Sequence, residues 1–192
     1  MCISERGVDM EAEPLDIEGV LLLRPDRHRD ERGFLCEVYN ERVLADVGIG
    51  DDFVQENHIA SERPGTIRGL HFQIEPHPAA KLLRVVRGAV FDVVVDLRHD
   101  SGTYGHHSTV ELSAENWTQI YIPVGVAHGL CTLEPETEIT YRVSDYWSSE
   151  VDRGLLWNDP DIAIHWPVSA NEAIVSDKDR SQPRLSELPR FF

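Results

Sequence analysis

Two histidines stand in apolar surroundings where they could carry protons. His71 lies in the stretch TIRGLHFQ, and His128 follows a turn at Pro123 and Gly125 in IPVGVAHGLC. An imidazole titrates at about pH 6.5, so either ring could take up and release a proton at neutral pH. A histidine on an apolar strand is also often a hydrogen-bonded core residue, so the residues around His71 and His128 must decide between catalysis and packing.

The spacing PxGxxH that ends at His128 resembles the second half of the cupin motif, in which a barrel often holds a metal ion. The first half should read HxH followed by a glutamate, but here HFQ runs from His71 to Gln73. A metal that needs three or four protein ligands therefore lacks its set, and we expect no metal and no cofactor. The alternative is a metal-dependent oxygenase or isomerase that uses His71 and His128 with Glu75 and His77.

Two cations, Arg68 and Lys81, accompany these histidines. Arg68 precedes His71 in IRGLHF, and Lys81 begins the apolar run KLLRVVRG. A charged side chain inside a barrel is costly unless something pairs with it, so each cation either points outward or has a function inside. The pattern alone leaves both orientations open.

The elements that must position these side chains are short strands. Apolar runs rich in Val, Ile, Leu, Tyr and Phe are bounded by Gly, Pro, Asp and Ser. The runs are GVLLLRP, RGFLCEVY, KLLRVVRGAVFDVVVDLR, STVELS, TQIYIPVG, HGLCTLE and EITYRVSDYW. Helical spacing is convincing only in NERVLADVG, where Val43, Leu44 and Val47 could share a face before Gly48 ends the helix. The sequence predicts an all-β jelly-roll, cupin-like barrel with a few short helices.

Length and composition favour one domain. The 192 residues are 41% hydrophobic and show no internal repeat. Residues 1–13 are expected to form a loose N-terminal extension, and residues 14–192 a single jelly-roll domain. No apolar run approaches the roughly 20 residues of a membrane span, and MCISERGVDMEAEP is too acidic for a signal peptide.

The charge balance limits the partners. A formal net charge of -16 repels phosphate backbones and anionic lipids, so neither nucleic acid nor a membrane is expected as a partner. Several basic side chains could still form a local pocket for a small anion, namely Arg24, Arg32, Arg68, Lys81, Arg84 and Arg87. The cysteines Cys2, Cys36 and Cys131 have no CxxC spacing and suit a reducing cytoplasm.

A series of motifs in unbroken order resembles the dTDP-4-dehydrorhamnose 3,5-epimerase family from about residue 18 to 183. The motifs are DERGFLCEVYNE, VQENH, IRGLHFQ, KLLRVVRG, FDVVVDLR, ELSAENWTQIYIPVGVAHG, YRVSDYW and WNDPDIAIHWP. The resemblance implies a cofactor-independent isomerase that inverts the carbons beside the ketone of a dTDP-linked 4-keto-6-deoxy-hexose. Such a reaction needs a base, a stabiliser for the enolate and a second proton carrier across the ring.

The resemblance also implies the residues that do this chemistry. His71 matches the base, and Asp179 matches the aspartate that orients it, although Asp177 is close by in the sequence. Lys81 matches the lysine beside the keto oxygen, and Tyr141 matches the tyrosine that returns a proton from the opposite face.

The implied substrate-binding set is larger. Arg32 and Arg68 fit positions that hold the diphosphate, because a planar guanidinium suits phosphate oxygens. Gln55 and Asn57 are expected to bind the nucleotide or sugar, and His128 is expected to donate a hydrogen bond. The remaining members are Phe34, Glu37, Arg24 and Trp147.

Some positions depart from the family pattern and leave the specificity open. Arg142 and Trp147 replace a common lysine and tyrosine, and Val126 and Leu130 stand where phenylalanines are common. Inversion at C3, at C5 or at both is therefore unresolved, and a single-centre epimerase of an antibiotic deoxysugar pathway is an alternative. A non-catalytic carbohydrate-binding jelly roll is a further one.

The resemblance finally implies a homodimer. Members of the family exchange N-terminal strands between barrels, which would cover GVLLLRP, otherwise an exposed sheet edge.

Overall fold

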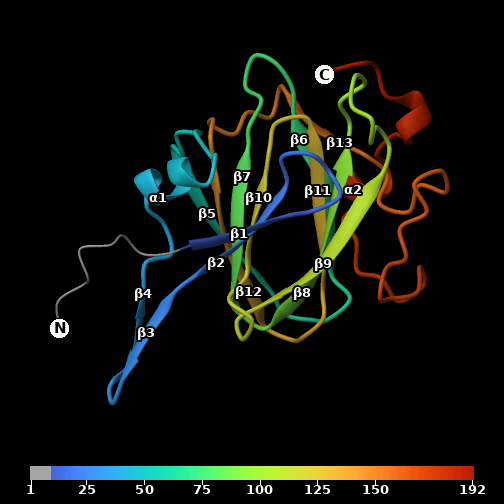
Figure 1. Cartoon of the computed structure of the whole chain (residues 1–192). Coiled ribbons are helices and arrows are strands. Elements are labelled where there is room, and N and C mark those ends of the chain that lie inside the picture. Colours follow the sequence, from blue (N-terminus) through green and yellow to red (C-terminus); the bar gives the residue numbers. More distant parts are fainter. Residues whose placement is uncertain (1–9) are drawn as a thin grey trace.

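A computed structural model describes residues 10–192, in which two antiparallel sheets face each other as a jelly-roll barrel (Figure 1). The six-stranded sheet has the order β1 (Met10–Pro14), β2 (Leu21–Pro25), β10 (Gln119–Ile122), β7 (Lys81–Arg87), β12 (Thr137–Val143) and β5 (Gln55–Ser61). The five-stranded sheet has the order β13 (Asp152–Gly154), β6 (Ile67–Gln73), β11 (Val126–Thr132), β8 (Ala89–Asp96) and β9 (His107–Ser113). This confirms the predicted fold class.

The remaining elements are short. β3 (Arg27–Asp30) and β4 (Gly33–Cys36) form a hairpin that projects from the barrel (Figure 1). Helix α1 (Glu41–Asp46) is capped at its N-terminus by Asn40, whose side chain accepts the Arg42 N–H, and buries Leu44 as the sequence predicts. Helix α2 (Asp177–Arg180) and a 3₁₀ turn (Leu185–Glu187) lie near the C-terminus.

The main core lies between the two sheets. Leu83 and Val85 of β7 pack with Val90 and Val94 of β8. The opposite face of β8 is also buried, because Val93 and Val95 contact a cluster that includes the C-terminal segment. A strand buried on both faces explains why AVFDVVVD is nearly continuous in apolar residues.

The apolar runs of the sequence all contain strands, whereas β5 was not predicted. Its sequence, QENHIAS, is mostly polar, and every second residue is exposed at the edge of the sheet. Backbone pairing with β12 from Gln55 to Ser61 holds the strand in place. Polar edge strands of this kind lack the apolar signal on which the prediction depended.

The N-terminal boundary needs a correction. Residues 1–9 lie outside the described part of the chain, but Met10–Glu13, expected to be loose, belong to β1. This strand pairs with β2 from Met10 opposite Pro25 to Pro14 opposite Leu21. GVLLLRP is therefore not an edge, since β2 lies between β1 and β10, and the exposed β1 is the edge instead. A single domain over residues 14–192 stays a prediction.

Neither helix in residues 10–192 has the length and apolar character needed to cross a bilayer. Cys36 and Cys131, the cysteines that the structure describes, are free thiols.

Candidate active site

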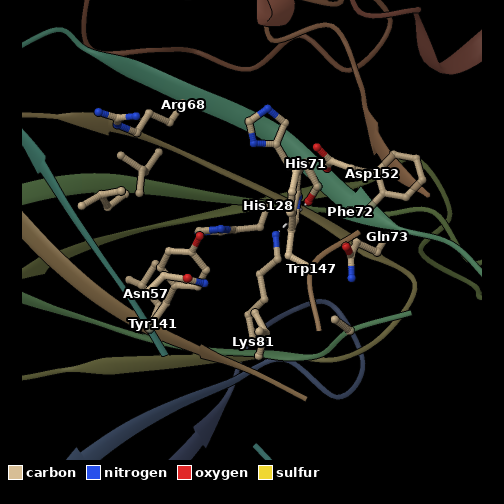
Figure 2. Close-up of a pocket in the computed structure, with 15 residues that line it drawn as sticks. Asn57, Arg68, His71, Phe72, Gln73, Lys81, His128, Tyr141, Trp147 and Asp152 are labelled. Carbon is tan, nitrogen blue, oxygen red and sulfur yellow. Dashed lines mark hydrogen bonds between the residues drawn. The ribbon is translucent and has the colours of Figure 1, made fainter. Parts of the chain in front are cut away.

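A pocket of about 210 Å³ lies between the sheets and is lined by β5, β6, β7, β11 and β12 (Figure 2). Arg68 and His71 extend from β6 on one side, and Tyr141 and Lys81 come from β12 and β7 on the other. The predicted residues that line it are Asn57, Arg68, His71, Lys81, His128, Tyr141 and Trp147. The inward orientation of Arg68 and Lys81, which the sequence left open, is thereby resolved.

A bulge in β6 brings Arg68 and His71 to the same wall. Strict alternation would place residues three apart on opposite faces of the sheet. The register against β11 shifts between His128, opposite His71, and Leu130, opposite Arg68, so two residues of β6 face one of β11. One of them is Gly69, with φ 132°, where a Cβ would lie 2.5 Å from the Cα of Gly129. A glycine is therefore required for the bulge to pack this closely.

His71 is paired with a buried carboxylate. Its Nε2 lies 2.7 Å from Oδ1 of Asp179, whose side chain is 5% exposed. Burial alone would raise the pKa of Asp179, but the contacts with His71, Gly69 and Ser176 hold it below its ordinary value. Because an ionised carboxylate only accepts hydrogen bonds, the neutral form of the ring carries its proton on Nε2 and has its lone pair on Nδ1. Asp177, the neighbouring candidate, is exposed.

Lys81 crosses the pocket toward β6. Its ammonium donates a hydrogen bond to the backbone oxygen of His71 at 3.0 Å. Burial lowers the pKa of Lys81 to about 8, while the carboxylates of Asp152 and Asp92 oppose this lowering. The ammonium of Lys81 is thus held close to His71, and its pKa lies near neutral pH.

Tyr141 lies on the sheet opposite His71. Burial raises the pKa of its hydroxyl, whereas a hydrogen bond from Asn57 and the charge of Arg68 lower it. The phenol therefore stays protonated at neutral pH and can donate a proton. His71 and Tyr141, two of the ionisable rings that line the pocket, thus approach it from different sheets.

A second histidine–aspartate pair lies deeper. Nε2 of His128 is 2.8 Å from Oδ2 of Asp92, and both side chains are almost fully buried. The other oxygen of Asp92, Oδ1, has no hydrogen-bond partner among the described residues. His128 lines the pocket, whereas its partner Asp92 does not.

Gln55 reaches the site through its neighbours. It does not line the pocket, but its Nε2 donates to Oδ1 of Asn57 at 2.9 Å and its Oε1 accepts the Trp147 N–H at 3.2 Å. Trp147 is 58% exposed at the mouth. Gln55 therefore fixes two residues that do line the pocket.

Four predicted binding residues lie away from the pocket within one chain. Arg32, in the turn of the projecting hairpin, is paired with Asp30. Phe34 is 48% exposed and packs edge-on against Trp117. The other two form local contacts, Glu37 with Asn40 and Arg24 with Glu13. The hairpin extends away from the barrel (Figure 1). Within one chain these four residues do not reach the pocket, so their role in substrate binding stays a prediction.

Two further polar residues of the site were missed by the sequence analysis. Asp152 lines the pocket and forms an ion pair with Lys178 at 2.5 Å. Gln73 lines the pocket two residues after His71. Asp152 lies in the charged stretch SSEVDRG, where no spacing distinguishes it from solvated carboxylates. Gln73 drew attention only because it stands where the cupin motif HxH has its second histidine.

Within residues 10–192, no group of three or more His, Cys, Asp or Glu side chains is arranged to hold a metal ion. His71 and His128 each direct Nε2 at a carboxylate, and His77 contacts Asp145. The proposed metal set of His71, His128, Glu75 and His77 is therefore not assembled.

Comparison with known proteins gives consistent matches over nearly the whole chain. A family model described as dTDP-4-dehydrorhamnose 3,5-epimerase matches residues 14–187. The dTDP-4-dehydrorhamnose 3,5-epimerase of Sinorhizobium fredii is 47% identical over 188 residues, which cover 96% of this chain and 94% of the relative.

Solved structures agree with these matches. A dTDP-4-dehydrorhamnose 3,5-epimerase from Bacillus anthracis, with TDP and PPi bound, has a TM-score of 0.89 and 45% identity, covering 92% of this chain and 99% of that one. A dTDP-6-deoxy-D-glucose-3,5-epimerase from Legionella pneumophila, in complex with dTDP-4-keto-L-rhamnose, has a TM-score of 0.88 and 36% identity, covering 94% and 95%. The chain belongs to the dTDP-4-dehydrorhamnose 3,5-epimerase family.

Proposed function

We propose that this protein epimerises a dTDP-linked 4-keto-6-deoxy-hexose at the carbons on either side of the ketone. The observation that carries the proposal is the opposition of a carboxylate-paired histidine, His71, and a protonated tyrosine, Tyr141, across one pocket. The family match and the dTDP-sugar bound by the Legionella pneumophila relative support this substrate class.

In the proposed reaction, His71 removes the proton from carbon. With Nε2–H donated to Asp179, the lone pair of Nδ1 is free to accept a proton. Asp179 keeps the ring in this tautomer and stabilises the imidazolium that forms. The pair therefore supplies the base without any further group.

Lys81 stabilises the enolate. A C–H bond beside a ketone is removable only when negative charge on the oxygen is stabilised as it develops. The ammonium of Lys81 is already fixed by its hydrogen bond to the His71 backbone, so little reorganisation is needed during the reaction. His128, held by Asp92, offers a further polar contact from the floor.

Tyr141 returns a proton from the opposite face, which inverts the carbon. Its position on β12, across from His71 on β6, supports this role. The proton-transfer set of His71, Lys81 and Tyr141 requires no cofactor for the step that it performs.

The nucleotide is proposed to bind along the wall and mouth of the pocket. Arg68 would contact the diphosphate, since it lines the pocket and its guanidinium is held at the adjacent strand β5 by hydrogen bonds to Ser61 and Ala60. The exposed indole of Trp147 offers a flat surface for the base.

We also propose a homodimer, as the family resemblance implies. Phe34 and Leu35 are 48% and 63% exposed on the projecting hairpin, which is unfavourable for an isolated chain. A second copy would cover them and would give Arg32, Phe34 and Glu37 a pocket to reach. Sedimentation at micromolar concentration tests this, and a species of 21.8 kDa would contradict it. A cytoplasmic location, expected from the cysteines, stays a prediction.

Deuterium wash-in tests the catalytic proposal. The protein is incubated in D₂O with dTDP-4-keto-6-deoxyglucose, and NMR follows C3 and C5. Deuterium at both carbons with inversion supports double epimerisation, and deuterium at one carbon indicates a single-centre enzyme. A protein that binds dTDP without any exchange would instead be a carbohydrate-binding module.

A further inference from the structure

Gln73 uses its whole carboxamide to hold the mouth of the pocket. Its Nε2 donates to the backbone oxygens of His77 at 2.8 Å and Tyr146 at 3.3 Å. Its Oε1 accepts the N–H of Ser148 at 2.7 Å. Three backbone groups from two separate loops therefore meet on one side chain, which extends from the same strand as His71.

The loop that carries Trp147 is fixed at both ends by such contacts. At its start, Ser144 exchanges hydrogen bonds with Ala80: the Ser144 N–H donates to the Ala80 oxygen, and the Ser144 hydroxyl accepts the Ala80 N–H. At its end, Ser148 donates to Gln73. Between these points Trp147 has one backbone contact, with Gln55, and its indole is 58% exposed. We call Ser144–Ser148 the mouth segment.

One more pair joins the mouth segment to the neighbouring loop. Nδ1 of His77 lies 3.1 Å from Oδ2 of Asp145, but both side chains are partly exposed to solvent. Exposed pairs contribute little, because water and salt screen them. The link from β6 itself to the mouth segment is made by Gln73, through its hydrogen bonds with Ser148 and Tyr146.

We propose that Gln73 is a positioning residue for substrate binding, which fixes the mouth segment and thereby holds the indole of Trp147 over the pocket. The proposal rests on the proposed function of this pocket. A mouth segment that is ordered before binding spares the substrate the entropic cost of ordering it, so Gln73 acts on affinity. It does not contact the proton-transfer atoms of His71, so the chemical step should be largely independent of it.

A glutamine suits this place because it offers a donor and an acceptor on one flexible stem. Glutamate keeps the acceptor for Ser148 but sets a carboxylate against the oxygens of His77 and Tyr146. Methionine keeps the volume and loses every hydrogen bond. The two variants, Gln73→Glu and Gln73→Met, therefore remove different parts of the link.

The test compares Gln73→Met with a matched control, Gln119→Met. Gln119 is buried and donates one side-chain hydrogen bond to the backbone oxygen of Val38, and it does not line the active-site pocket. We expect Gln73→Met to raise both KM for dTDP-4-keto-6-deoxyglucose and Kd for dTDP about tenfold, equivalent to about 1.4 kcal/mol. Its kcat should stay within about threefold of wild type, and Gln119→Met should leave KM and Kd unchanged.

Amide hydrogen exchange gives a readout that needs no substrate. The mouth segment should exchange faster in Gln73→Met than in wild type or Gln119→Met, because its Ser148 N–H loses its acceptor. Unchanged exchange would overturn the proposal whatever the enzyme does. If wild type binds no dTDP and exchanges no substrate deuterium, the proposed function fails, and amide exchange still tests the positioning of the segment.

A double variant shows whether Gln73 acts through Trp147. If it does, Gln73→Met should add less than about twofold to the KM of Trp147→Ala. Additive effects, or a fall in kcat at unchanged KM, would mean that Gln73 acts elsewhere and would refute the assignment. If Gln73→Met fails to fold, Gln73→Glu replaces it in the KM, Kd and double-variant arms with the same expectations. In the amide-exchange arm the mouth segment should still exchange faster than in wild type, because the carboxylate opposes the backbone oxygens of His77 and Tyr146.

Discussion

Lys81 should set the alkaline limit of catalysis. Burial lowers the pKa of its ammonium from 10.5 to about 8. This difference corresponds to a loss of about 3 kcal/mol in the preference for the charged form. If only the ammonium stabilises the enolate, activity follows the charged fraction, which falls from about nine tenths at pH 7 to about one tenth at pH 9. We expect kcat/KM to fall about tenfold over this range, with its midpoint near pH 8.

The stability of the protein should change in the opposite direction. Because the folded pKa of Lys81 is the lower one, the unfolded chain binds more protons between about pH 8 and pH 10.5. The contribution of Lys81 to the free energy of unfolding therefore rises with pH in this window. Unfolding through Lys81 therefore cannot account for the alkaline loss of activity. The difference between the urea unfolding free energies of wild type and Lys81→Met, measured across this pH window, checks the contribution.

Neighbouring charges should move the alkaline limit in a predictable way. The carboxylate of Asp152 raises the pKa of Lys81, and Lys178 is the ion-pair partner of that carboxylate. Asp152→Asn should lower the midpoint, and Lys178→Gln should raise it, each by about 0.5 to 1 pH unit. The assay is kcat/KM from pH 6 to 9.5 at constant ionic strength. A midpoint that stays the same in both variants, or moves in the same direction in both, would refute the assignment to Lys81.

The other predictions concern the proton path and the bulge. His71→Ala should reduce turnover by about 10³-fold or more and leave the Kd for dTDP largely unchanged, and near-normal turnover would return His71 to a packing role. Asp179→Asn should reduce kcat more than it raises KM, because the ring loses its fixed tautomer; equal kcat in wild type and variant would contradict this. Tyr141→Phe should let deuterium exchange by NMR outlast inversion, whereas a parallel loss of both would exclude Tyr141 as a dedicated second acid. Gly69→Ala should lower the free energy of unfolding, measured in urea, by about 2 to 3 kcal/mol more than the control Gly33→Ala. Both glycines have a similar positive φ, but a Cβ at Gly33 meets nothing within 4 Å. Equal losses in the two variants would show that close packing of Gly69 against Gly129 is unimportant.

The strands that bury apolar side chains could be predicted from the sequence, and the edge strands could not. β8 is apolar nearly throughout because both of its faces are covered. β1 and β5 are held by backbone hydrogen bonds, which are the same for every residue type except proline and so leave no side-chain pattern.

The candidate site was predictable where a motif carried it, and its geometry was not. The family resemblance led to His71, Lys81 and Tyr141, which line one pocket. Strict alternation would have placed Arg68 and His71 on opposite faces of the sheet. The bulge that brings them together could not be predicted, because it depends on how two strands pack and not on the sequence of either one. Asp152 had no signal, since its importance comes from the charges that the fold brings near it.

The pairing of His71 with Asp179 joins a barrel strand to a segment made long after it. Asp179 belongs to α2, beyond the last strand of either sheet, and that C-terminal segment packs on the outer face of the five-stranded sheet. During synthesis the ribosome releases every strand before it releases Asp179. At that stage the chain contains every strand that lines the pocket but no carboxylate partner for His71.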